Sequence, residues 1–182
     1  MNTLPFRGTQ GLVAAALLLV APAAPAAAQA DLNDLEMAHV AVTASNIDIA
    51  YAHLALALSG NPEIRRFAET MIRDHTAVNG QVAALAEKLG VQAQDNPMSR
   101  KLLADAQGIK DRLSRLRGAE FDRFYASNEL AYHKTVNGVV AEAFIPNIEN
   151  AEVKEAFKAA LAIFRGHEGH AERMVARVQG GM

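Results

Sequence analysis

The sequence predicts an all-α protein, an antiparallel four-helix bundle with an extra connecting helix. Three observations support this fold class. No stretch sustains the alternation of apolar and polar residues that is typical of a half-buried strand. Only 5% of the residues are aromatic, and the glycine and proline residues fall between long segments with helical spacing. Long helical segments separated by short breaks are typical of helices packed against one another.

Residues 1–30 have the composition of a secretory signal peptide. Arg7 is their one charged residue, an apolar run follows over residues 11–20, and the segment closes with Ala28-Gln29-Ala30, an A-x-A cleavage sequence. The apolar run is shorter than the roughly 20 residues of a membrane-spanning helix. We therefore expect a periplasmic or secreted protein that is cleaved near Ala30 and keeps no stable membrane anchor. An uncleaved N-terminal anchor is the alternative.

The remaining residues, 31–182, have the size of one domain with a sizeable core. They carry 17 Lys and Arg (18 minus Arg7) against 20 Asp and Glu, a net charge of about −3, and the basic residues are spread out. This charge pattern argues against a nucleic acid as partner. The chain has no cysteine, so neither disulfides nor thiolate ligands are available. A homo-oligomer is compatible with the sequence.

The first predicted helix covers residues 32–59 and is apolar almost all round, as a buried helix is. Asp48 lies among its apolar residues and needs a partner there, because an isolated buried charge is costly. Asn61 and Pro62 predict the cap and first residue of a second helix, which we expect to end at Gly90. Its buried face includes His75 but not Asp74, for which we expect solvent or a neighbouring arginine such as Arg73.

A shorter, amphipathic and interrupted helix is predicted over residues 97–117, as the connection between two halves. The third long helix is predicted over residues 119–144, before Pro146, with Glu129 and His133 one turn apart on its inner face. The fourth is predicted over residues 150–178, with His167 on its buried side. Three helices therefore each present an inward histidine, and the first presents the acid.

Residues 67–79 and 125–137 share the pattern aromatic-Ala-x-x-x-aliphatic-x-x-His-x-x-Val-Asn, at a constant offset of 58 residues. Four positions are identical, among them the two histidines, His75 and His133. An internal repeat would explain this match. Chance in an alanine-rich chain is the other explanation, and the sequence does not decide between them.

The chain resembles the bacterial domain of unknown function 4142 family. The resemblance rests on Phe67-Ala68-x-x-Met71-Ile72-x-Asp74-His75-Thr76, on Phe121-Asp122-Arg123-x-Tyr125 and on the later histidines His133 and His167. It covers nearly all of residues 31–182 and implies a ferritin-like fold in an exported protein, without implying an activity. Two positions depart from the family pattern, since Asp48 stands where Glu is common and Tyr132 replaces an acidic residue.

The candidate metal ligands are His75, His133 and His167 with Glu129 or Asp48. Imidazole and carboxylate donors of this kind suit zinc, copper or iron. A di-iron oxidase is not indicated, because such sites use Glu-x-x-His on two helices. The positions three residues before the inward histidines hold Ile72, Leu130 and Phe164 instead, and the one match, Glu36 to His39, reads as a first-turn acid beside a surface histidine.

Other enzyme classes are not indicated either. His167-Glu168-Gly169-His170 is one residue shorter than the zinc-protease motif His-Glu-x-x-His. The chain has no nucleophile elbow, glycine-rich phosphate loop or cysteine nucleophile. The methionines are dispersed, and Met71 and Met174 fit the core. The sequence thus leaves two hypotheses, an exported bundle that binds one transition metal without evident enzymatic chemistry, and a purely structural or protein-interaction bundle in an envelope stress response.

Overall fold

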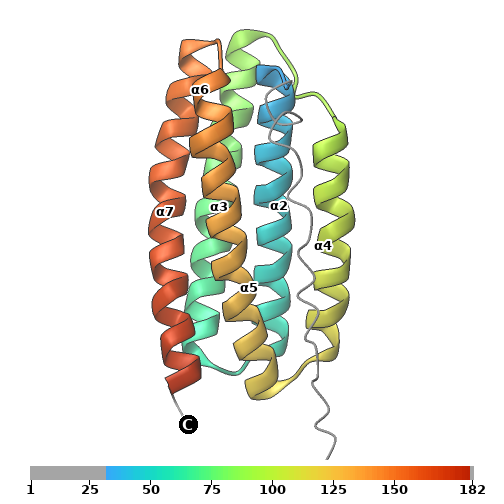
Figure 1. Cartoon of the computed structure of the whole chain (residues 1–182), viewed down its shortest axis with the longest axis vertical. Coiled ribbons are helices and arrows are strands. Elements are labelled where there is room, and N and C mark those ends of the chain that lie inside the picture. The colour runs from blue at the N-terminus through green and yellow to red at the C-terminus, as the bar shows by residue number, and fades with distance from the viewer. Residues whose placement is uncertain (1–31, 181–182) are drawn as a thin grey trace, which may run out of the picture.

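The computed structural model describes residues 32–180, and these residues form an all-helical structure with five long helices (Figure 1). The long helices are α2 (Asp34–Leu58), α3 (Pro62–Leu89), α4 (Pro97–Arg115), α5 (Gly118–Val139) and α7 (Ala151–Gly180). A π-helical segment, η1 (Val140–Phe144), and the short α6 (Ile145–Asn147) follow α5 directly. The predicted signal peptide lies outside the described residues.

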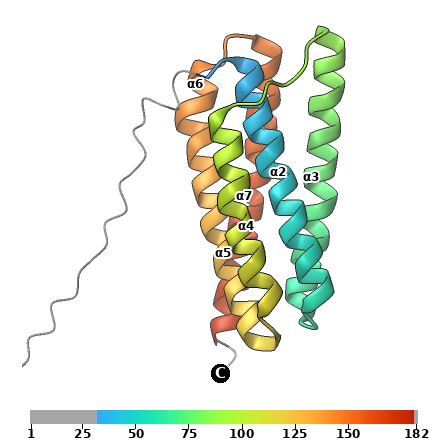
Figure 2. The same ribbon diagram turned by 90° about the vertical axis from the view of Figure 1, so that its right-hand side faces the viewer.

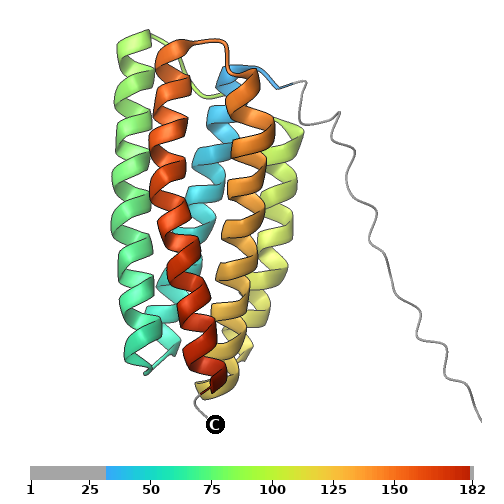
Figure 3. The same ribbon diagram turned by 60° about the vertical axis from the view of Figure 1, so that its left-hand side comes forward.

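Consecutive long helices run in opposite directions, so α2, α4 and α7 descend in Figure 1 while α3 and α5 ascend. Figure 3 shows α3 and α7 side by side on one flank and α4 on the opposite flank behind α5, and in Figure 2 α4 lies in front. Helix α4 packs mainly on α2. It is uninterrupted over its whole length, so the prediction of an interrupted connection was wrong.

The helix starts follow local capping chemistry. Asn33 accepts hydrogen bonds from the amides of Leu35 and Glu36, while Glu36 accepts one from the amide of Asn33, a complete capping box. Asn61 caps α3 before Pro62, and α3 ends at Gly90, whose φ of 67° lies in the left-handed region that glycine adopts without strain. These two ends of α3 were predicted correctly.

The end of α5 differs from the prediction. We expected the helix to stop at Phe144, but η1 and α6 extend helical backbone to Asn147. Pro146 is tolerated because the preceding turn is π-helical and α6 is only one turn long. The sequence contains no marker for the π-helical segment, since its residues are ordinary helix formers.

Apolar side chains form two core clusters along the axis of the molecule. One cluster contains Ile47, Phe67, Tyr125 and Met174, and the other contains Met37, Val40, Val140, Phe144 and Phe157. Between them, the same helices carry buried polar residues, namely Ser45, Asp48, His75, Glu129, His133 and His167. The polar group therefore lies at mid-height and is enclosed by apolar layers above and below.

Helix α2 is long and apolar enough to cross a membrane by length and composition. Half of the residues in its most apolar 18-residue stretch are buried inside the structure, where α3, α4 and α5 pack around the helix. The core helices of soluble proteins can have the same length and apolar composition, so these two properties do not by themselves indicate a membrane protein.

Candidate metal centre

Four helices contribute to a cluster of buried polar side chains. Asp48 comes from α2, His75 from α3, Glu129 and His133 from α5, and His167 from α7. All five residues are at most 5% exposed. The structure therefore brings together every residue that the sequence analysis named as a candidate ligand. Whether they bind a metal stays a prediction.

The three histidines lie close enough to share one ion. One ring nitrogen of each can be chosen so that all three atoms lie within 4.8 Å of one another. The ring centroids are 5.9 Å apart for His75 and His133, 5.4 Å for His75 and His167, and 5.6 Å for His133 and His167. Two atoms that bind one zinc ion at about 2.0–2.2 Å lie at most about 4.4 Å apart, so only small movements would be needed.

Each histidine has one ring nitrogen held by a neighbouring group. Nδ1 of His133 donates to the Glu129 carbonyl one turn earlier at 2.9 Å. Nδ1 of His75 lies 3.0 Å from the Ser45 hydroxyl, and Nε2 of His167 lies 3.0 Å from the Asp74 carboxylate. Contacts of this kind fix the orientation of a ring and determine which nitrogen is left for a metal.

The other nitrogen of each ring is buried and has no hydrogen-bond partner among the described residues. These atoms are Nε2 of His75, Nε2 of His133 and Nδ1 of His167. Both Asp48 carboxylate oxygens have no hydrogen-bond partner either. Since buried polar atoms in native proteins are nearly always paired, so many orphaned atoms in one place require an explanation.

Asp48 Oδ2 lies 2.7 Å from Nε2 of His75 and 3.4 Å from Nε2 of His133. Both distances are those of ion pairs, and the shorter contact is among the causes that lower the pKa of Asp48. Two ligands of one tetrahedral zinc ion lie about 3.3–3.6 Å apart. A metal bound between Asp48 and His75 would therefore require these two groups to separate slightly.

The pKa values of the two buried carboxyl groups are shifted in opposite directions. Burial raises the pKa of Asp48, but the contact with His75 and the charge of His133 together lower it below the ordinary value. Burial, and then the negative charge of Asp48, raise the pKa of Glu129 well above its ordinary value. The site thus favours the ionised form of Asp48 and the protonated form of Glu129.

Burial lowers the pKa of two of the histidines. It is the largest cause for His133, where the nearby Asp48 charge opposes it. For His167, burial and the charges of His75 and His133 outweigh the hydrogen bond that Nε2 makes to the Asp74 carboxylate, and they bring the pKa to about 4. Both rings are neutral at pH 7, which is the state in which imidazole binds metals.

Three contacts were not foreseen. Asp74 pairs with Arg73 at 2.7 Å as expected, but it also reaches His167. The second contact joins Ser45 to His75. Ser45 lies three residues before Asp48 on α2, and this one-turn spacing was the signal that could have identified Ser45 as part of the cluster. The third contact is made by Phe164 of α7, which is half-buried and whose ring stacks on His75 with centroids 4.4 Å apart.

The surroundings of the methionines, of His39 and of Tyr132 bear on the roles that the sequence analysis gave them. Met37, Met71 and Met174 are at most 1% exposed and fill the core. His39 is half-buried and bonds Ser99 at 2.8 Å, so the prediction of a surface histidine was wrong. Tyr132, the family departure beside His133, donates its hydroxyl to the Ala44 carbonyl at 2.9 Å, which takes it out of the group of candidate ligands.

Comparison with known proteins gives a family but no characterised relative. Neither the curated proteins nor the solved structures contain a match. The model of one protein family, described as a domain of unknown function, DUF4142, matches residues 19–174. That range covers most of the sequence and contains all five candidate ligands. The chain therefore belongs to the DUF4142 family of domains of unknown function.

Proposed function

We propose that the protein binds one transition-metal ion at the buried cluster. The ligands are Nε2 of His75, Nε2 of His133, Nδ1 of His167 and the carboxylate of Asp48. The observation that carries the proposal is that each of these atoms is buried without an aligned hydrogen bond, while the opposite nitrogen of each ring is held in place. A cation bound there would satisfy all four groups at once.

The donor set favours zinc, iron or copper in the divalent state. Three imidazoles and one carboxylate supply borderline nitrogen ligands and a single negative charge. Glu129 takes an outer position in this proposal, since burial beside the charge of Asp48 raises its pKa and disfavours its ionised form. A cavity of about 30 Å³ beside His75 and His133 has room for about one water molecule. The site thus suits a small exchangeable ligand on the metal and excludes a large substrate from it.

We further propose that the bundle is ferritin-like, with α2, α3, α5 and α7 as its four helices and α4 as an addition. Support comes from the origin of the cluster, because these four helices supply all five candidate residues and α4 supplies none. Cofactor sites in four-helix bundles are built from facing helices in this way. Residues 31–182 then form a single domain.

We also propose that the protein is exported and acts in the periplasm or outside the cell. The composition of residues 1–30 supports this proposal. Mass spectrometry of the protein from its native host should give an N-terminus near Asp31. An intact Met1 on a membrane-bound protein would contradict it.

The metal proposal is tested by the metal content and melting temperature of protein purified without chelators. We expect close to one equivalent of metal per chain and, after stripping, a rise in melting temperature on adding zinc, iron(II) or copper(II), because binding to the native state stabilises it. A purely structural bundle predicts neither result. Absence of stoichiometric metal together with an unchanged melting temperature for all three ions would overturn the proposal.

A further inference from the structure

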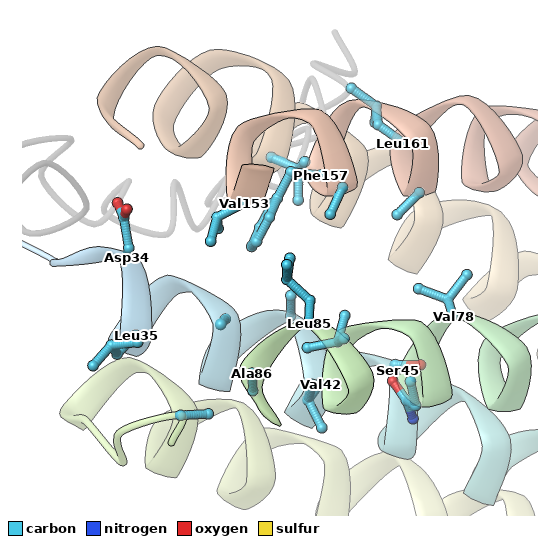
Figure 4. Close-up of a pocket in the computed structure, with 18 of the residues that line it drawn as sticks. Asp34, Leu35, Val42, Ser45, Val78, Leu85, Ala86, Val153, Phe157 and Leu161 are labelled. Carbon is cyan, nitrogen blue, oxygen red and sulfur yellow. The ribbon is translucent and has the colours of Figure 1, made fainter. Parts of the chain in front are cut away.

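A pocket of about 80 Å³ lies between α2, α3 and the first half of α7 (Figure 4). In the figure, Val153, Phe157 and Leu161 of α7 face Leu85 of α3 and the side chains of α2 across it. Valine, leucine, alanine and phenylalanine make up nearly all of its lining, and the polar lining residues are Asp34, Ser45 and Asn79. An occupant would therefore be recognised by apolar contact.

The pocket is elongated. Asp34 and Ser45, which line its two ends on α2, are eleven residues apart, a distance of about 16 Å along a helix. Many of its apolar side chains, including Leu85 and Ala160, are only half-buried. The pocket is therefore a long apolar slot that reaches solvent.

The two walls of the slot are joined on either side of it. Lys88 of α3 forms a salt bridge with Glu152 of α7 next to the outer end, and Asp74 of α3 bonds His167 of α7 beyond the inner end. A partner helix is about 10–12 Å across and would have to separate α3 from α7, which pack on each other, to enter. An extended chain of methylene groups is much thinner and would not.

The inner end of the slot adjoins the candidate metal centre. Four residues, Ala41, Ser45, Val140 and Phe164, line both the slot and the small cavity that His75 and His133 also line. Phe164 forms the partition, since its ring stacks on His75 at an angle of 8°. A molecule in the slot would contact the face of Phe164 and, through it, the ring of His75.

We propose that this slot binds a free, unbranched alkyl molecule, with the inner end of the chain against Phe164. Burial of the methylene groups against the valine and leucine side chains drives binding, and the two interhelical contacts select a narrow chain. The binding itself is independent of the metal. A role for the bound chain next to the metal rests on the proposed function above.

The test uses 1-decanol as the probe and metal-free protein as the receptor. We expect saturable binding by calorimetry, and nuclear Overhauser contacts from the decanol methylenes to the methyl groups of Val82 and Leu85. Resonances of the Phe164 and His75 rings should shift on binding. No saturable binding up to the solubility limit, or contacts to other parts of the protein, would overturn the proposal.

Variants locate the site. Ala160→Trp fills the slot and should weaken decanol binding about tenfold or more, and Ala38→Trp should do the same from the α2 wall. Ala159→Trp is the matched control, because Ala159 is the exposed neighbour outside the slot. Equal loss in all three correctly folded variants would contradict the assignment. Zinc affinity of Ala160→Trp should equal that of the wild type, so a failure of metal binding and a failure of alkyl binding are distinguishable.

A lipid bilayer is the other source of alkyl chains. The outer end of the slot carries the charged side chains of Asp34, Lys88 and Glu152. Because insertion of charged groups into bilayer hydrocarbon is costly, we expect no cosedimentation with phosphatidylcholine vesicles. Cosedimentation that Ala160→Trp abolishes, without binding of monomeric decanol, would overturn the proposal of a free ligand.

Discussion

Asp48 Oδ2 lies 2.7 Å from Nε2 of His75, and neither atom makes a properly aligned hydrogen bond. The two residues belong to different helices, and their side chains are 0% and 6% exposed. An unaligned contact of two buried polar atoms would be costly without a third partner. This pair and its neighbours lead to several testable expectations.

The two buried carboxyl groups should respond differently to amide substitution. Asp48→Asn removes the charged ligand and should weaken zinc binding by more than about 100-fold, beyond the range seen for outer-sphere changes. Glu129→Gln should change zinc affinity little, because the raised pKa of Glu129 favours its uncharged form and glutamine has nearly the same shape. Competition with a chromophoric chelator measures both affinities. Asp105→Asn, an exposed control, should match the wild type, and a larger loss for Glu129→Gln than for Asp48→Asn would reverse the assignment.

Asp74 should act through His167. Its carboxylate holds Nε2 of His167 at 3.0 Å and so directs Nδ1 toward the cluster. Asp74→Asn should weaken zinc binding about 10–100-fold, as loss of an outer-sphere carboxylate does. Arg73→Gln is the control, because it leaves the carboxylate in place and removes only its exposed salt bridge. If Arg73→Gln weakened zinc binding as much as Asp74→Asn, the cause would be the change in surface charge and not the loss of the contact between Asp74 and His167.

The metal-free protein should lose stability as the pH falls. The pKa of His167 is about 4 in the folded protein, against 6.5 for the exposed residue. Between these values the unfolded chain takes up a proton that the folded protein does not, so stability decreases as pH drops from 6.5 toward 4. The loss for His167 alone should reach roughly 3 kcal/mol.

Urea denaturation at pH 7, 6, 5 and 4.5 with chelator present measures this effect. His167→Gln keeps every other titrating group, so the difference between its profile and that of the wild type isolates His167. The wild type should lose more stability than the variant over this range. Parallel profiles would show that the folded and unfolded states titrate His167 alike.

Replacement of a core aromatic residue gives a check on the packing. Phe67 is fully buried between the rings of Tyr125 and His133, so Phe67→Ala should cost about 3–5 kcal/mol. Phe164→Ala should cost less, because Phe164 is half-buried beside the slot. Denaturant unfolding measures both. A loss under about 1 kcal/mol for Phe67 would contradict the described core.

The sequence predicted the helical class and the inward direction of the three histidines because both depend on one regular period. His75, His133 and His167 each continue an apolar stripe at helical spacing, and the apolar stripe of a helix faces the protein core. Asp48 was predictable for the same reason, as a charge on a helix that is apolar almost all round. Asn61, Pro62 and Gly90 marked the ends of α3 by local chemistry alone.

Contacts between stripes were not predictable in this way. Asp74 lies next to the buried face of α3 and meets His167 only because α7 packs on that side. Phe164 follows the apolar period of α7, but its exposure depends on how far α3 stands from α7. Periodicity gives the direction of a side chain relative to its own helix, whereas these features depend on the distance between two helices.

The π-helical segment η1 begins less than two turns after His133, the second candidate ligand on α5. A π-turn contains about one residue more than an α-turn, so it is equivalent to a one-residue insertion absorbed inside a continuous helix. In a regular α-helix, one extra residue would rotate everything after it by about 100° relative to His133. The π-turn absorbs that rotation and keeps Phe144 buried against Phe157. Removing Ala141 should therefore restore a regular helix and leave Phe144 in the core, whereas an insertion outside η1 would turn Phe144 away from it.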